Sequence, residues 1–267
     1  MPEDESPEFD TSVAHPARIY DYWLGGKDNF AADRAAGDRV IEIRPEIIVG
    51  VRANRRFLRR AVRYLVEQEG IRQFLDIGTG LPSANNTHEV AQALAPDARV
   101  VYADNDPIVL AHARALLTSA PEGRTAFISA DLRDASTVIS EAARTLDFGQ
   151  PVAVMFLMTL QYIPDADDPH AIVARYVAAL PPGSFLVVSD TTIHDQDAVL
   201  TESTRRMNEG MAGRATQTRR TTAEIARFFD GLELAPPGLA MLDHWRPEAD
   251  DPGGRDFPAY CGIGRKG

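Results

Sequence analysis

Short apolar runs alternate with helical patterns from residue 71 to the end of the chain. Five of these runs have few charges and carry Val, Ile, Leu or Phe at successive positions: IRQFLDI (71–77), RVVYAD (99–104), TAFISAD (125–131), VAVMFLM (152–158) and SFLVVSD (184–190). Such runs are typical of strands that are buried on both faces of a parallel sheet. The alternation therefore predicts an α/β fold with a mostly parallel sheet flanked by helices.

Helical patterns connect these runs. Asp106 stands at an N-cap position and Pro107 at the first helical position, so we predict that a crossover helix begins there. Another helix is predicted within residues 165–180, where a Pro-Pro-Gly sequence follows and ends it. Two later runs are expected to complete the sheet: AMLDHW (240–245) and AYCGIG (259–264).

The first 70 residues have a different pattern. Residues 17–41 are typical of short helices interrupted at Gly25 and Gly26. Residues 51–70 have the apolar spacing of an amphipathic helix that ends at Gly70. We therefore predict two units: an N-terminal extension and helical cap (1–70), and a main domain (71–267).

A possible nucleotide-binding turn lies in FLDIGTGLPSANN (74–86). Gly78 and Gly80 follow a predicted strand, as in the dinucleotide fingerprint G-x-G-x-x-G. Ser83 occupies the position of the third glycine, and Pro82 precedes it. The match is partial, and a plain tight turn explains two glycines equally well.

Four carboxylates identify the ligand better than the glycines do. Asp76 lies at the end of the first predicted strand, Asp104 and Asp106 at the end of the second, and Asp131 after the third. These strand ends meet at one edge of a parallel sheet, so the acids face one crevice. Clustered carboxylates repel a pyrophosphate and suit a ligand with cationic groups and sugar hydroxyls.

Charge and composition narrow the possible partners. The chain has 28 Lys and Arg against 39 Asp and Glu, a formal charge of −11, which argues against a nucleic-acid partner. The longest apolar stretch, residues 152–158, is too short for a membrane span. The acidic N-terminus and the single cysteine, Cys261, favour a cytoplasmic protein, and the six histidines show no metal-ligand spacing.

S-adenosylmethionine combines a sulfonium, an ammonium, a ribose diol and an adenine amino group without any phosphate. An acid after the second strand suits the ribose hydroxyls, and an acid after the third suits the adenine amine. We assign these roles to Asp104 and Asp131, with Asn105 and the backbone amide of Leu132 beside the adenine.

The chain resembles the Rossmann-like class I S-adenosylmethionine-dependent methyltransferases in FLDIGTG, VVYADNDP, SADLRD and MFLMTLQYIPD. ARIYDYWLGGKDNFAADR, GTGLPSANNTHEVAQ and FFDGLELAPPGLAMLDHWRP resemble a methyltransferase family of unassigned substrate. The resemblance implies a seven-stranded sheet and S-adenosylmethionine as cofactor. The predicted cofactor-binding residues are Asp76, Gly78, Thr79, Gly80, Asp104, Asn105, Asp131 and Leu132.

The chain departs from the general methyltransferase pattern at three points. Pro82 replaces a small residue, and the loop that follows is long, so we expect the next helix to begin late, near Asn86 or Thr87. Gln161 stands where similar enzymes often carry histidine. No NPPY-type tetrapeptide follows the fourth strand, which argues against methylation of nucleic-acid bases.

The sequence gives two weak candidates for catalysis, so the catalytic residues stay unassigned. His194, after the fifth strand, is a candidate general base, and the alternative is a solvated loop histidine. Tyr162, after the fourth strand, is a candidate acceptor contact, and the alternative is a packing residue.

A polar and aromatic cluster surrounds the Gly25-Gly26 pair. We predict a lid over the cleft that includes Tyr20, Tyr22, Gly26 and Asn29; the alternative is a helix packed on the sheet edge.

The helix over residues 51–70 carries an arginine face. We expect a solvated face paired with local acids such as Glu67 and Glu69 or with the acidic N-terminus. The alternative is attraction of an acidic acceptor or of the cofactor carboxylate, with Asn54 and Arg55 at the border of that face.

These observations predict an S-adenosylmethionine-dependent methyltransferase that acts on a small-molecule acceptor. One alternative is a protein that binds the cofactor without catalysis, as a sensor or partner subunit. The other is an NAD-dependent oxidoreductase, which the missing third glycine and the clustered acids disfavour. The residues identify neither the acceptor nor an oligomeric state.

Overall fold

The computed structural model describes residues 10–83, 85–116, 119–193, 197–213, 215–249, 251 and 256–267. In this part of the chain, eight strands form one sheet. They are β1 (Gln73–Ile77), β2 (Arg99–Asp104), β3 (Arg124–Ser129), β4 (Ala153–Leu157), β5 (Phe185–Thr191), β6 (Glu233–Leu234), β7 (Ala240–Met241) and β8 (Ala259–Arg265).

The sheet is mostly parallel, as predicted. Seven strands follow one path in the order β3-β2-β1-β4-β5-β8-β6, and the two-residue β7 pairs with β8 as an eighth strand. The first five strands pair in parallel, and β8 pairs antiparallel with β5. Each of the five apolar runs forms one of the parallel strands. Four of these strands, β1, β2, β4 and β5, are almost wholly buried, whereas β3 at the edge of the sheet is only partly buried.

Nine α-helices surround the sheet in the described residues: α1 (Pro16–Leu24), α2 (Ala31–Ile41), α3 (Ile47–Glu67), α4 (Thr87–Leu94), α5 (Pro107–Leu116), α6 (Ala135–Ala142), α7 (Pro169–Ala179), α8 (Ala198–Gly210) and α9 (Thr222–Ala226). Within the described ranges, no helix has both the length and the apolar character that a bilayer-spanning segment requires. One apolar cluster joins α3 and α4 to one sheet face, and a second joins α6 and α7 to the other. Neighbouring residues of β1 divide accordingly: Phe74 lies in the first cluster, and Leu75 in the second.

Two predicted helix starts are confirmed. The side chain of Asp106 accepts a hydrogen bond from the Ile108 amide at 2.9 Å, and α5 begins at Pro107. The helix after the glycine turn begins late, at Thr87 with Asn86 as N-cap, and Glu89 accepts a hydrogen bond from the Asn86 amide at 2.7 Å. These local caps satisfy backbone donors that have no partner inside the helix.

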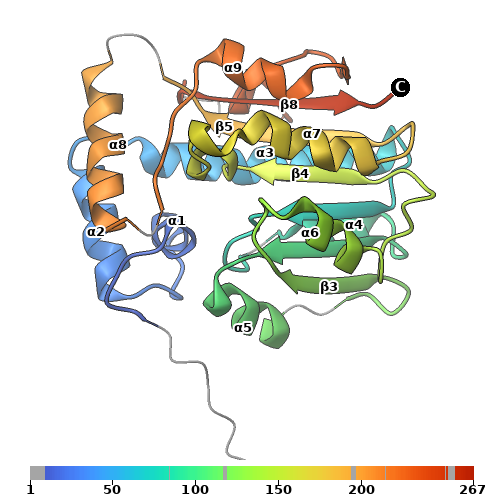
Figure 1. The fold of residues 1–267 in the computed structure, drawn as a ribbon, viewed down its shortest axis with the longest axis horizontal. Helices are drawn as coiled ribbons and strands as arrows, with labels where there is room; N and C mark the ends of the chain where they lie inside the picture. Colours follow the sequence, from blue (N-terminus) through green and yellow to red (C-terminus); the bar gives the residue numbers. More distant parts are fainter. Residues whose placement is uncertain are drawn as a thin grey trace, which may run out of the picture.

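The N-terminal helices pack beside α8 at one end of the molecule (Figure 1). The arrowheads of β3 and β4 point toward this end, so α1 and α2 lie beyond the carboxyl ends of the parallel strands. Ile19 of α1, Ala36 of α2 and Met207 of α8 belong to the same apolar cluster as Phe74 of β1. The same core therefore holds these helices against the sheet.

The arginine side chains of α3 pair mainly with a distant part of the chain. Arg56 forms an ion pair with Asp243 at 2.7 Å, and Arg59 forms one with Glu248 at 2.5 Å. The prediction of a solvated face paired with nearby acids is therefore wrong for these residues. Arg63 fits it in part, because it contacts Glu67 at 3.7 Å as well as Glu248 at 3.2 Å, and Arg52 is exposed as predicted. The partners come from residues 243–251, which no local sequence pattern could identify.

Arg60 is the buried member of this face. Its Nη1 donates to Asp251 at 2.6 Å, its Nη2 to the Leu242 carbonyl at 2.6 Å, and its Nε to the Trp245 carbonyl at 2.9 Å. Arg60 is 3% exposed, and its hydrogen bonds hold Leu242, Trp245 and Asp251 against α3.

Replacing Arg60 with alanine should lower the free energy of unfolding by about 3–5 kcal/mol, because it leaves a carboxylate and two carbonyls buried without their donor. Arg63→Ala, whose side chain is half exposed, should cost less than about 1 kcal/mol. Urea denaturation of both variants measures the difference. Equal losses would show that the buried pairing of Arg60 does not hold this segment.

Candidate active site

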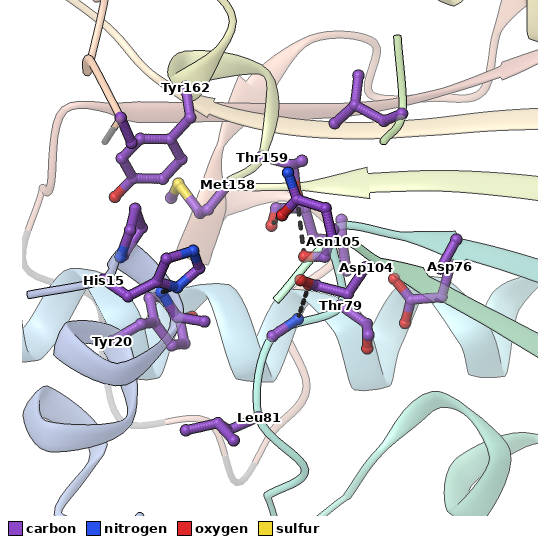
Figure 2. Close-up of a pocket in the computed structure, with 18 of the residues that line it drawn as sticks. His15, Tyr20, Asp76, Thr79, Leu81, Asp104, Asn105, Met158, Thr159 and Tyr162 are labelled. Carbon is purple, nitrogen blue, oxygen red and sulfur yellow. Dashed lines mark hydrogen bonds between the residues drawn. The ribbon is translucent and has the colours of Figure 1, made fainter. Parts of the chain in front are cut away.

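A cavity of about 360 Å³ opens at the carboxyl ends of the parallel strands. Its walls come from the ends of β1, β2 and β4, from the segments that follow β1, β2, β3 and β4, and from α1 and α3. Figure 2 shows many of the side chains that line it. The volume lies within the range of small-molecule sites, which are commonly about 300–1,000 Å³.

The structure brings all the predicted cofactor-binding residues to this cavity. Its lining includes Asp76, Gly78, Thr79, Gly80, Asp104, Asn105, Asp131 and Leu132. Tyr162 also lines it, and so does Tyr20 from the predicted lid. His194 lies outside the described residues.

The glycine turn needs both of its glycines. Gly78 and Gly80 have φ angles of +68° and +66°, a region that favours glycine. A Cβ at Gly78 would lie 2.2 Å from Cγ2 of Thr159, the second residue after β4. The turn therefore lies against the β4 end, and the two segments form a common wall of the cavity.

Asp104 connects the glycine turn to the start of α5. Its Oδ2 accepts the Gly80 amide at 2.8 Å, and its Oδ1 accepts the Asp106 amide at 2.9 Å. Each carboxylate oxygen can accept a further hydrogen bond, so this residue holds the turn and retains acceptor capacity toward the cavity. Burial raises the pKa of Asp104, while its two backbone donors act in the opposite direction.

Asp76 is a buried carboxylate at the end of β1. Only 5% of the residue is exposed, and its Oδ2 accepts the hydroxyl of Thr87 at 2.6 Å. Burial raises the pKa of Asp76 to about 6. Arg55 of α3 also lines the cavity, and its positive charge lowers the pKa of Asp76. The structure thus places the positive charge of Arg55 near Asp76, one of the carboxylates that are predicted to bind the cofactor.

Asp131 has a different environment. Arg133 donates to both of its carboxylate oxygens, at 3.0 Å from Nε and 2.5 Å from Nη2, and this hydrogen bonding holds the pKa of Asp131 below its usual range. Leu132, between the two, also lines the cavity. Asp131, after β3, is therefore ionised, and Arg133 balances its negative charge. Asp76 and Asp104 are instead buried, and burial raises the pKa of both.

Only part of the predicted lid reaches the cavity. Tyr20 donates its hydroxyl to the Val51 carbonyl at 3.1 Å and accepts from Asn54 at 3.0 Å. Tyr22 instead donates to Asp38 of α2 at 2.6 Å. Asn29 donates to Asp21 and to the Gly26 carbonyl and so holds the chain after α1 in place. Tyr22, Gly26 and Asn29 do not line the cavity, whereas Asp21 does.

The segment after β4 turns sharply beside the cavity. Met158 has a φ angle of +56°, which is uncommon for a residue with a side chain, and its amide donates to the Ser189 carbonyl at 2.9 Å. Tyr162 lies close by, and burial raises the pKa of its hydroxyl. Gln161 accepts from Thr191 at 2.5 Å and joins β5 to this segment.

Sequence reasoning missed His15 as a site residue. It precedes α1 and lines the cavity, and its Nδ1 lies 3.0 Å from Oδ2 of Asp106. The available signal was its place before Pro16, a position typical of a helix N-cap. That signal predicts a helix start and contains no information about a contact with Asp106, which precedes α5.

A model of the S-adenosyl methyltransferase family matches residues 2–267. The chain belongs to this family. Its members use S-adenosylmethionine as methyl donor, so the protein is a methyltransferase enzyme with this cofactor. Family membership favours this function over the two alternatives, the non-catalytic binder and the NAD-dependent oxidoreductase.

Solved structures resemble the methyltransferase over its whole length. A DUF574-family protein from Streptomyces avermitilis is 42% identical, with a TM-score of 0.91 over 97% of this chain and 99% of that one. A candidate methyltransferase from Thermobifida fusca is 39% identical, with a TM-score of 0.88 over 99% of both chains. None of the curated proteins compared with the chain matches it.

A more distant match shows the fold alone. An O-methyltransferase family protein from Burkholderia thailandensis is 15% identical, with a TM-score of 0.52 over 92% of this chain and 63% of that one.

The side chains of the cavity fit S-adenosylmethionine. Asp76, Asp104 and Asp131 accept hydrogen bonds or pair with positive charge, which suits a ribose diol, an amino group and an ammonium. Three carboxylates in one cavity do not suit a pyrophosphate. The hydrogen-bond acceptors of the cavity therefore agree with the donors that the cofactor of the family carries.

The raised pKa of Asp76 predicts a pH-dependent cost to stability. Below about pH 4 this carboxyl is protonated in both the folded and the unfolded states. As the pH rises through the folded pKa of about 6, the folded state must hold a buried anion and loses stability. Asp76→Asn keeps an acceptor for Thr87 without the charge. It should match the wild type near pH 4 and exceed its unfolding free energy by about 3 kcal/mol at pH 8.

Chemical denaturation at both pH values measures this effect. Asp131→Asn is the matched control with the opposite sign, because Arg133 stabilises the ionised form of Asp131. If the difference in unfolding free energy between Asp76→Asn and the wild type does not change with pH, the pKa of Asp76 is not raised in the folded state.

Proposed function

We propose that this methyltransferase binds S-adenosylmethionine in the cavity at the strand ends and methylates a small-molecule acceptor. The observation that supports the proposal is Asp104, a buried carboxylate that holds the glycine turn and still has acceptor capacity toward the cavity. Its position after β2 suits a ribose diol. Asp131 and the Leu132 amide, after β3, suit the amino group and a ring nitrogen of adenine.

The methionyl end of the cofactor then lies near the glycine turn and α3. Asp76 suits the ammonium group, and Arg55 suits the carboxylate, because a guanidinium binds a carboxylate through charge-assisted hydrogen bonds. This assignment agrees with the alternative interpretation of the arginine face of α3, in which this face attracts the cofactor carboxylate and Asn54 and Arg55 lie at its border. Both residues line the cavity, whereas Arg56, Arg59 and Arg60 pair with acids near the C-terminus.

The bound cofactor supplies an electrophilic methyl group on a sulfonium. The chain contributes alignment and exclusion of water, which accelerate an in-line displacement. Tyr20, Met158 and Tyr162 lie together on one side of the cavity (Figure 2). We assign this side to the acceptor and α1 to a cover over it. The net charge of −11 and the partly apolar lining favour a small molecule over nucleic acid.

Asp104→Asn should weaken binding of S-adenosylhomocysteine at least tenfold. The carboxylate accepts on both of its oxygens, whereas an amide has one acceptor oxygen and a nitrogen that only donates, so one backbone amide or the ribose hydroxyl loses its acceptor. Asp97→Asn, an exposed acid in the loop before β2, should leave affinity unchanged. Isothermal titration calorimetry measures both variants. The wild type should bind S-adenosylmethionine and S-adenosylhomocysteine and should not bind NAD; binding of NAD alone would refute the proposal.

Tyr20→Ala should raise the Kd for S-adenosylhomocysteine or lower turnover by at least fivefold, because it removes a wall of the cavity. Tyr22→Ala removes a tyrosine of the same helix that faces Asp38 and should change affinity less than twofold. Calorimetry below the Tm of each variant gives the comparison. If the two variants behave alike, α1 does not act as a cover.

A further inference from the structure

One polar group on the acceptor side of the cavity has no partner in the described part of the chain. Tyr162 lines this side beside Met158, with its hydroxyl at the end of the ring that is directed toward α1 (Figure 2). This hydroxyl makes no hydrogen bond to the described residues, and it is not among the unpartnered polar atoms that are fully buried. The oxygen is therefore accessible from the cavity and free to bind a ligand.

Two neighbouring polar side chains, Tyr20 and Asn54, are already bound to each other and to the core. Asn54 donates to the Tyr20 hydroxyl at 3.0 Å, and this hydroxyl donates to the Val51 carbonyl at 3.1 Å. The amide oxygen of Asn54 accepts from the Ser189 hydroxyl at 2.7 Å. These groups form the wall of the cavity, whereas the hydroxyl of Tyr162 is left for a bound molecule.

The buried guanidinium of Arg220 holds the chain on both sides of Tyr162. Arg220 is 1% exposed; its Nη1 donates to the Leu160 carbonyl at 2.8 Å and its Nη2 to the Ile163 carbonyl at 2.6 Å. A donor whose backbone is fixed before the ligand arrives loses less conformational entropy on binding. Tyr162 is thus a positioned hydrogen-bond donor.

Positive charge lies near this hydroxyl. Burial raises the pKa of Tyr162, which keeps the hydroxyl protonated, and the charge of Arg219 acts in the opposite direction. Among the described residues Arg219 binds neutral groups only: its Nε donates to Thr204 at 2.5 Å and its Nη2 to Ser203 at 3.3 Å, while its Nη1 is buried without a partner. Burial and the charge of Arg44 lower the pKa of Arg219 to about 10. An anion nearby would stabilise this cation.

The acids that act on Arg219 have other partners. Asp190 lies 3.6 Å from Arg220, and the side chain of Asp197 accepts the Leu200 amide at 3.0 Å at the start of α8. The lining residues from the described segments 158–164, 213 and 215–216 include no charged side chain. This wall therefore offers no carboxylate to an amine and suits an anionic group instead.

The acid that α1 contributes to the cavity belongs to the chain that follows this helix. Oδ2 of Asp21 accepts the Asp28 amide at 3.0 Å and the Asn29 side chain at 2.8 Å. These bonds use Asp21 to hold the turn after α1, and they leave the charge preference of the opposite wall unchanged.

We propose that Tyr162 binds a carboxylate of the acceptor and that the enzyme methylates this carboxylate to a methyl ester. The inference rests on the proposed function, because it requires the cofactor in the same cavity. A carboxyl group has a pKa of about 4 and is ionised at neutral pH, so its attack needs alignment and no general base. Met158, Ile163 and Ala215 beside Tyr162 suit an apolar body, so we expect a small aromatic acid.

The step balances without another reactant. One carboxylate oxygen of the acceptor forms a bond to the methyl carbon while the bond from that carbon to the sulfonium sulfur breaks. The electron pair of the broken bond stays on sulfur, which yields S-adenosylhomocysteine and a neutral ester. No proton is transferred, and the Tyr162 hydroxyl donates to the other carboxylate oxygen.

Binding of benzoate to the complex with S-adenosylhomocysteine tests the site without turnover. Benzoate should bind at least tenfold more tightly than benzamide, which has the same shape and no charge. Tyr162→Phe removes the hydroxyl alone and should weaken benzoate binding at least fivefold, with less than threefold change in the Kd of S-adenosylhomocysteine. Tyr22→Phe, which removes a hydroxyl that faces Asp38 outside the cavity, is the matched control and should change neither Kd. Isothermal titration calorimetry measures all of these.

The second measurement is transfer of labelled methyl from S-adenosylmethionine to benzoate, phenylacetate and indole-3-acetate, with 4-methylphenol and benzylamine as acceptors of other classes. The wild type should methylate at least one of the acids. Mild alkali should release the label as methanol, because it hydrolyses an ester and leaves an ether or an amine intact. Tyr162→Phe should raise the KM for the acid at least fivefold.

Methylation of the phenol or the amine without any of the acids, equal binding of benzoate and benzamide, or an unchanged Kd of benzoate in Tyr162→Phe would overturn the inference. If neither S-adenosylmethionine nor S-adenosylhomocysteine binds, the proposed function fails. If they bind and none of the acids binds or reacts, only the acceptor class and the role of Tyr162 fail.

Discussion

The carboxylate of Asp104 is the interaction on which the rest of the site depends. It accepts the amide of Gly80 on one oxygen and the amide of Asp106 on the other, and so joins the glycine turn to the start of α5. Asp106 in turn contacts His15 at the start of α1. Asp104 at the end of β2 and Asp106 before α5 thus connect the sheet to the glycine turn and to the start of α1.

This arrangement carries an electrostatic cost that suits a cationic ligand. Asp76 and Asp104 are buried, and burial raises the pKa of both. A buried anion without a full set of partners destabilises the folded protein. The cofactor of the family carries hydroxyl, amino and ammonium donors, which under the proposed function would supply partners to these carboxylates.

The cavity divides chemically into two sides. The strand ends provide carboxylates and a glycine turn, whereas α1 and the segment after β4 provide tyrosines, a methionine and a histidine. The proposed function assigns the first side to the cofactor and the second side to the acceptor. The shared apolar core holds α1 against the sheet, so the two sides belong to one packed unit.

The sequence by itself determined the features that depend on neighbouring residues. Apolar runs with few charges predicted the five parallel strands, and the caps at Asp106 and Asn86 predicted where two helices begin. The acids at the strand ends followed from the same pattern, because parallel strands bring their carboxyl ends together. The tertiary structure alone decided the pairing of Arg60 with Asp251 and the contact of His15 with Asp106. Each of these contacts joins segments that are far apart in the chain. Which side chains meet across such a distance depends on how the whole fold packs, and the local spacing of residues does not predict it.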